Sequence, residues 1–229
     1  MNRTVISRHF SFASSLAALF AALLVTCFLP AHAAAKLTLS SWNLSEQRLT
    51  VREGVMSELG GAGFAGAQHL SAQTESTALA AIAAREGTAP VNFNTASSLT
   101  LVRFDALLVD QLGLADVAEH VQQVTAGAGL SPPSYFGSEV VARYLGLRYN
   151  HPAGEDALEL YPRDLITRAE AAHSFAAVLG FEGWDVSSAR EELSTFSLPQ
   201  YSAAQRQALH IAVSKIGMPY VWGGTTDNT

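Results

Sequence analysis

Three short strings of the type Leu-Gly-apolar lie in the middle of the chain, and they constrain its fold more than any other feature. Each string closes an amphipathic helical run, because glycine adopts the left-handed conformation that helix ends favour without a steric penalty. A helical unit that recurs along the chain is therefore expected, with the glycine of each string in the left-handed conformation. The strings occupy residues 112–114, 145–147 and 179–181.

Two segments align on their glycines, so that residues 99–114 match residues 166–181 in apolar spacing. Each segment is preceded by a further helical stretch and by a proline-containing loop. Those preceding stretches are residues 76–85 and 139–147. The sequence thus predicts a mainly α module of helix–loop–helix repeats over residues 76–196.

The second copy carries a distinctive string at the start of its second helix. Ile166-Thr-Arg-Ala-Glu170 follows Leu160-Tyr-Pro162, and this arrangement resembles a surface-layer homology repeat, whose second helix opens with Ile-Thr-Arg-Ala-Glu. Thr167 is expected to cap the helix by accepting a backbone N–H bond. Glu170, three residues on, is expected to complete a capping box.

The resemblance implies that Thr167, Arg168 and Glu170 are candidates for binding a cell-wall polymer. In that family the arginine contacts anionic polysaccharide, and its planar fork suits a carboxylate or pyruvyl group. The structural alternative is that Arg168 pairs with Glu170 or a neighbouring acid, while Thr167 and Glu170 only cap a helix. A single intact copy favours this alternative, since binding surfaces need several contacts. The first copy has Leu101 and Arg103 at the matching positions, and is expected to have lost ligand chemistry.

A second resemblance lies near the end of the sequence. A helix is expected to start near Ala203 with Ser202 as its cap. Residues 215–227 then read Lys-Ile-Gly-Met-Pro-Tyr-Val-Trp-Gly-Gly-Thr-Thr-Asp. This order resembles the opening of the NlpC-type cysteine peptidases of bacterial cell walls, which begin with a helix followed by Gly-x-Pro-Tyr-x-Trp-Gly-Gly. Residues 203–229 are therefore interpreted as the truncated start of a papain-like α+β domain.

The peptidase resemblance implies a substrate cleft in which the tyrosine hydroxyl helps to stabilise an oxyanion. The alternative is that the two aromatic residues pack the first strand and its turn. In this chain the alternative is favoured, because the walls of a cleft need residues that the sequence does not contain. The cleft candidates are Tyr220, Trp222, Gly223 and Gly224.

The catalytic groups of such an enzyme would come later in the chain. In the family an Asp-Cys-Ser-Gly segment and then a base histidine follow, whereas the sequence given ends at Thr229. The complete enzyme would cleave stem peptides of peptidoglycan through a cysteine thiolate and would need no cofactor. With no cysteine after Cys27, the chain as given is expected to be inactive. The rival hypothesis is a non-catalytic envelope-binding protein that acts through its helical module.

The first 33 residues have the pattern of a secretory signal peptide. Two arginines precede an uncharged apolar run at residues 12–29, and Ala31-His-Ala33 fits a small-x-small cleavage site. The alternatives are an uncleaved membrane anchor and a lipidated Cys27. Cleavage after residue 33 predicts a protein secreted to the cell envelope, with no membrane attachment afterwards.

Charge and ligand counts exclude several classes of function. Removing the two arginines of the signal peptide takes the formal net charge from −6 to −8, which argues against binding nucleic acid. The remaining chain has no thiol, and its histidines lack the spacing of a metal site, so no metal is expected. Glu155, Asp156 and Glu159 form an acidic loop, interpreted as a solvated turn, with calcium as the distant alternative.

The remaining segments complete the expected organisation. Residues 34–75 are interpreted as a helical and loop segment, and a short helical run is expected to end at Leu193. Pro199 marks a linker over residues 197–202, because proline interrupts a helix. Within the first segment we expect a strand at 37–39, a helix at 51–59 and a glycine-rich loop at 60–63.

Overall fold

The computed structural model describes residues 42–152 and 155–219, and this part of the chain is mainly α-helical, as the sequence predicted. It has eight α-helices, two short 3-10 helices and no named strand in those two ranges. The 3-10 helices are Gly60–Ala62 and Asp156–Leu158. The α-helices are α2 (Leu44–Arg52), α3 (Ala72–Glu86), α4 (Leu101–Gln111), α5 (Ala115–Gly127), α6 (Phe136–Tyr144), α7 (Arg168–Gly180), α8 (Asp185–Ser194) and α9 (Ala203–Ser214).

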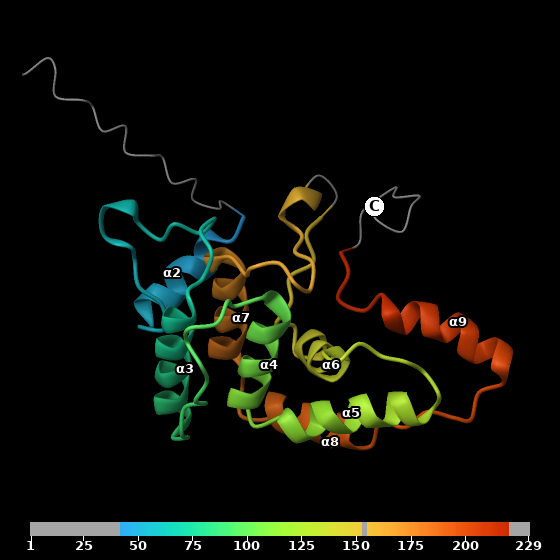
Figure 1. Ribbon diagram of the computed structural model, residues 1–229. Coiled ribbons are helices and arrows are strands. Elements are labelled where there is room, and N and C mark those ends of the chain that lie inside the picture. The colour runs from blue at the N-terminus through green and yellow to red at the C-terminus, as the bar shows by residue number, and fades with distance from the viewer. Residues whose placement is uncertain (1–41, 153–154, 220–229) are drawn as a thin grey trace, which may run out of the picture. The chain divides into compact units, whose positions relative to one another are not determined.

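The first residues of α3, α4 and α7 meet at one end of these helices (Figure 1). Leu70, Leu99 and Ile166 each precede the capping residue of one helix, and all three are buried. The backbone N–H of Leu70 donates to the carbonyl of Ile166 at 2.9 Å, and the N–H of Ile166 donates to the carbonyl of Leu99 at 3.2 Å. Main-chain hydrogen bonds therefore fix the three helix starts to one another, and they satisfy backbone groups that burial would otherwise leave unpaired.

The apolar core follows these three helices. Phe104 of α4 and Phe175 of α7 are fully buried and meet edge to face, with ring centroids 5.5 Å apart. Burying one such side chain contributes about 2–3 kcal/mol. The other helices cover this core: α2 packs on α7, α6 packs on both α4 and α5, and α8 packs on α5 and α6.

The crossing of α5 and α6 depends on one glycine. A Cβ atom placed on Gly137 would lie 1.9 Å from the carbonyl oxygen of Ala118, which is far inside van der Waals contact. The N–H of Gly137 also donates to Oε1 of Gln122 at 3.1 Å. The two backbones can approach this closely because residue 137 has no side chain.

Helix α9 differs from the others because it has no buried residue. Ser202 and Gln205 form a full capping box, which confirms the expected cap. Ile211 is 60% exposed, while Val213 and Ile216 pack against the core. The local signal in the sequence thus sets where α9 begins. The helix contacts the rest near both ends, through Arg206 beside Gly129 and through Val213.

Two expectations about helix ends are wrong. The helix expected at 51–59 shares only residues 51 and 52 with α2, which begins at Leu44 and ends at Arg52 because Gly54 adopts the left-handed conformation with φ +73°. Gly113 and Gly146 are left-handed as expected, but Gly180 is the last residue of α7 and lacks a positive φ. Extended Phe181 ends that helix instead.

Most of the remaining helices were expected from the sequence, and one was not. The runs around 76–85, 139–147 and up to Leu193 correspond to α3, α6 and α8, and the structure adds α5, which no expectation covered. The glycine-rich loop contains the first 3-10 helix. The expected strand at 37–39 and the signal peptide at 1–33, with Cys27, lie outside the described residues.

Candidate functional site

The Thr167–Glu170 motif occupies the first turn of α7. Oγ1 of Thr167 accepts a hydrogen bond from the N–H of Glu170 at 3.2 Å, so the expected cap is confirmed. The expected capping box is wrong, because the carboxylate of Glu170 does not return to the backbone of Thr167. Its Oε1 lies 2.6 Å from Nε2 of His151 instead. His151, from the loop after α6, therefore contacts the carboxylate that was expected to accept from the backbone N–H of Thr167.

Arg168 is buried, with 2% of its surface exposed. Its Nε donates to the carbonyl of Phe64 at 2.8 Å, and one terminal nitrogen donates to the carbonyl of Ser57 at 2.5 Å. The guanidinium also lies 4.8 Å from the ring centroid of Phe64. Burial lowers the pKa of Arg168 below its ordinary value, yet arginine remains charged at any physiological pH. The side chain holds the 57–64 loop against α7. Within residues 42–152 and 155–219 it forms no ion pair with an acid, contrary to the structural alternative.

His151 lies between two carboxylates. Its Nε2 contacts Glu170, and its Nδ1 lies 3.3 Å from Oε2 of Glu155. Burial acts to lower the pKa of His151, but the hydrogen bonds to Glu170 and Glu155 outweigh it, so the pKa is raised above that of a free histidine. The backbone N–H of His151 also donates to Oε1 of Glu159 at 2.5 Å. The acidic loop is therefore not a simple solvated turn, because Glu155 and Glu159 bind this histidine.

Four rings gather beside this pair, and we call them the ring cluster: Trp42, Tyr149, His151 and His173. The ring centroids of Trp42 and Tyr149 are 4.5 Å apart, and those of Trp42 and His151 are 4.6 Å apart. Tyr149 also meets His173 at 5.1 Å, in an edge-to-face arrangement. Such contacts contribute about 0.5–1.5 kcal/mol per pair beyond burial. The cluster therefore joins three segments, which are the start of α2, the loop that follows α6, and helix α7.

The edge of the ring cluster is acidic. Nδ1 of His173 lies 3.0 Å from Oε1 of Glu46, whose side chain is 30% exposed. The side chain of Glu155, on the other side of the cluster, is 39% exposed. Partly buried Trp42, Tyr149 and His173 thus lie between two partly exposed acidic side chains, and Oε2 of Glu46 is itself buried without a hydrogen-bond partner among the described residues. Apolar ring surface with a few hydrogen-bond acceptors around it is the composition of sites that bind polar organic ligands.

Sequence reasoning identified the motif in α7 and missed the ring cluster. Its members come from three segments that lie far apart in the sequence, and none belongs to a recognisable motif. From the sequence, His151, beside Pro152, and His173 were treated only as histidines that lack the spacing of a metal site. The pattern Arg-Tyr-Asn-His immediately after a helix was the only local signal that could have directed attention there.

The remaining site candidates are not placed. Tyr220, Trp222, Gly223 and Gly224 lie outside the described residues, so their role in a substrate cleft stays a prediction. Among the described residues, no group of three or more histidine, cysteine or acidic side chains is arranged to hold a metal ion.

Comparison of the chain with protein-family models, with curated proteins and with solved structures gives no match. In the part of the chain that the structure describes, every helix is too short or too polar to cross a membrane.

Proposed function

We propose that the helical module binds a cell-wall polymer, peptidoglycan or cell-wall polysaccharide, and that it belongs to the N-terminal part of a secreted cell-wall hydrolase. The complete enzyme would cut stem peptides of peptidoglycan with a cysteine nucleophile, and the chain as given would be inactive. The proposal rests on the two sequence resemblances and on the arrangement of residues around α7.

The ring cluster is the observation that carries the binding proposal. Sugars present C–H faces that pack on aromatic rings, while their hydroxyl groups donate to carboxylates. Trp42 and Tyr149 would supply ring surface, and Glu46 and Glu155 would supply acceptors. In this proposal Arg168 positions the 57–64 loop and does not contact the polymer, because its side chain is buried.

Cosedimentation of the purified protein with purified cell walls tests the binding site. Tyr149→Ala should raise the apparent dissociation constant, read from the fraction bound over a range of cell-wall concentrations, by about tenfold, which corresponds to about 1.4 kcal/mol. Tyr144→Ala is the matched control, because Tyr144 is 46% exposed on α6 and takes no part in the ring cluster. Equal binding of Tyr149→Ala and the unchanged protein, with both folded by circular dichroism, would remove the ring cluster as the binding site.

A non-catalytic envelope-binding protein is the second candidate, and the described residues favour it in one respect. They contain an organised ring cluster, which a binding protein needs and which takes no part in the proposed hydrolysis. Sequencing of the DNA beyond the codon for Thr229 separates the two candidates. An in-frame Asp-Cys-Ser-Gly segment supports the hydrolase, and a stop codon supports the binder.

A further inference from the structure

Three carboxyl groups are buried together below the helix starts, and we call them the carboxyl cluster: Glu75 of α3, Asp105 of α4 and Glu139 of α6. Each residue is at most 1% exposed. Among the described residues, five of their six oxygens have no hydrogen-bond partner; the sixth, Oε1 of Glu139, accepts from Arg143 at 2.7 Å. If all three carboxyl groups were ionised, the hydrogen bonds around them would therefore compensate little of their negative charge.

Two guanidinium groups lie near the cluster. Nε of buried Arg148 is 3.7 Å from Asp105 and 3.8 Å from Glu139, which are ion-pair distances without hydrogen-bond geometry. Arg143 reaches only Glu139 and is itself 40% exposed. No cation in the described residues contacts Glu75 within ion-pair distance. An uncompensated buried carboxylate costs several kcal/mol, so such a group takes up a proton instead.

The pKa values follow this geometry. Burial, reinforced by the charge of Asp105, raises the pKa of Glu75 well above its ordinary value. Burial also raises the pKa of Asp105, to about 7, although Arg148 opposes the rise; the neighbouring Glu139 adds to it and Arg143 opposes it. The folded state therefore holds protons that the unfolded chain would release between about pH 4 and 7.

The end of α9 and the residues that follow it lie against Glu139 of this cluster. We call residues 213–218 the arm. Val213 and Ile216 of the arm pack on the core, and Gly217 is buried with φ +77°. A Cβ atom on Gly217 would lie 3.2 Å from Cδ of Glu139 and 3.3 Å from Cγ of Pro162. The arm thus lies directly on Glu139.

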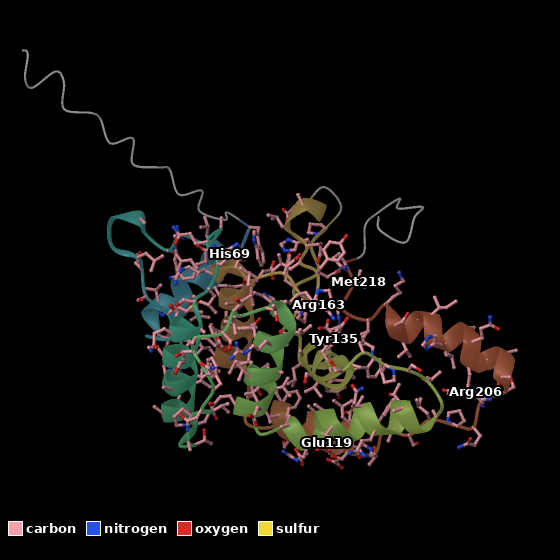
Figure 2. All side chains as sticks on the ribbon, in the orientation of Figure 1. His69, Glu119, Tyr135, Arg163, Arg206 and Met218 are labelled. Carbon is pink, nitrogen blue, oxygen red and sulfur yellow. The ribbon has the colours of Figure 1, made fainter. Side chains whose placement is uncertain are left out.

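Other charged or titratable groups face the same region. The hydroxyl of Tyr135 donates to the carbonyl of Ile216 at 3.5 Å, and the pKa of Tyr135 is raised by its burial and by the charge of Glu139. Arg163 lies near enough to Tyr135 to oppose that rise, and Lys215 belongs to the arm itself. Figure 2 labels Tyr135, Arg163 and Met218 in the region between α6 and the end of the arm.

We propose that docking of the arm on α6 is linked to protons held by the carboxyl cluster. With the arm in place, Glu139 is shielded from water, so the docked state favours the protonated cluster. With the arm displaced, water reaches Glu139, and an ionised cluster becomes less costly. Because a ligand shifts an equilibrium toward the state that binds it better, protons favour the docked state and alkaline pH favours release. The arm contains the first four residues of the peptidase-like string, Lys215 to Met218, so its docking holds the start of that string.

Hydrogen–deuterium exchange of the purified protein measures docking directly. Protection of the amides of residues 215–218, corrected for the intrinsic exchange rate, should fall at least tenfold between pH 5.5 and pH 8.5, since one linked proton changes an equilibrium by up to tenfold per pH unit. Amides within α4 should keep their protection over the same range. Equal protection of the arm at the two pH values, or a parallel loss in α4, would overturn the proposal.

A variant separates proton linkage from ordinary alkaline loosening. Glu139→Gln keeps an acceptor for Arg143 but removes the charge that acts on Asp105, so the proton held by Asp105 is no longer coupled to the arm. Its arm should therefore lose less than twofold in protection between the same pH values. Glu191→Gln, an exposed position on α8, is the control and should behave as the unchanged protein. If Glu139→Gln does not fold, Asp105→Asn takes its place with the same expected result. A folded variant whose arm loses protection as the unchanged protein does would contradict the proposal.

Discussion

The starts of α4 and α7 show how one position can be filled by opposite chemistry. Leu101 and Arg168 each follow a threonine cap, and both are buried, at 1% and 2% exposed. Leu101 packs in the apolar core, whereas Arg168 reaches carbonyls of the 57–64 loop. A buried arginine is tolerated where a loop supplies acceptors, and the segment facing each helix start decides which residue fits.

The third residue after each N-cap threonine shows the opposite arrangement, with an acid in α7 and an arginine in α4. Glu170 is buried against His151. Arg103 is directed to the surface, where it donates to the carbonyls of Asn94 and Ser98 at 2.7 and 2.9 Å. Both helices therefore begin with a threonine N-cap followed by a buried residue, while a polar site is organised at the start of α7. The predictions below exchange or remove these residues.

The largest effect is expected when α4 is given the residue of α7. Leu101→Arg would bury a guanidinium with no carbonyls placed to receive it, which should cost about 4 kcal/mol or more of unfolding free energy. Urea unfolding followed by circular dichroism measures the loss. Leu101→Met is the control and should cost less than about 1.5 kcal/mol. A loss of similar size in both variants would mean that the charge is accommodated at this position.

The reverse exchange should cost somewhat less. Arg168→Leu leaves the carbonyls of Ser57 and Phe64 without their donor, so a loss of about 3 kcal/mol is expected. Arg168→Lys should lie between, because a single ammonium cannot reproduce the planar fork. The same unfolding experiment applies, and an unchanged midpoint for Arg168→Leu would show that the loop is held by other contacts.

A smaller and pH-dependent effect is expected at the acid of the motif. The raised pKa of His151 means that its stabilising contribution is complete below the ordinary histidine value of about 6.5 and is lost as the pH rises through the folded value. Glu170→Gln removes the nearer carboxylate. It should cost about 1 kcal/mol at pH 5.5 and less at pH 8.5. Thermal unfolding at both pH values measures this difference, with Glu191→Gln as the control. A larger loss of stability at pH 8.5 than at pH 5.5 would contradict the prediction.

The smallest effect is expected at Arg103, the residue of α4 that matches Glu170 of α7. Arg103→Ala removes two hydrogen bonds at the surface and a contact 5.5 Å from the ring centroid of Phe93. About 0.5 kcal/mol is expected, because water replaces exposed partners easily. A loss as large as that of Arg168→Leu would mean that the two helix starts are less different than their burial indicates.

Local sequence signals located most of the helices, and the failures have physical causes. Ser202 with Gln205 was a correct start for α9, because a capping box needs only neighbouring residues. The end of α2 was misplaced, since Gly54 stopped the helix before its apolar pattern did. Helix α5 was missed, because the alignment of the two copies had no place for it.

The polar site was much less predictable than the helices. The cap at Thr167 depends on its own turn and was expected correctly. The partner of Glu170 depends on where the loop carrying His151 folds back, which no local pattern encodes. Trp42 and His173 likewise meet through the packing of α2 on α7, and Tyr149 reaches His173 because the loop after α6 lies against α7. Contacts between distant segments therefore account for what the sequence did not show.

The close crossing of α5 and α6 limits how this sequence can evolve. The atom that would meet a side chain at residue 137 is a backbone oxygen of Ala118, and every amino acid carries that oxygen. A second substitution, at residue 118, therefore cannot relieve the clash. A side chain at residue 137 is destabilising whether residue 118 is substituted before it or after it. Relatives that keep this crossing are bound to keep glycine at the position, even where the rest of both helices has diverged.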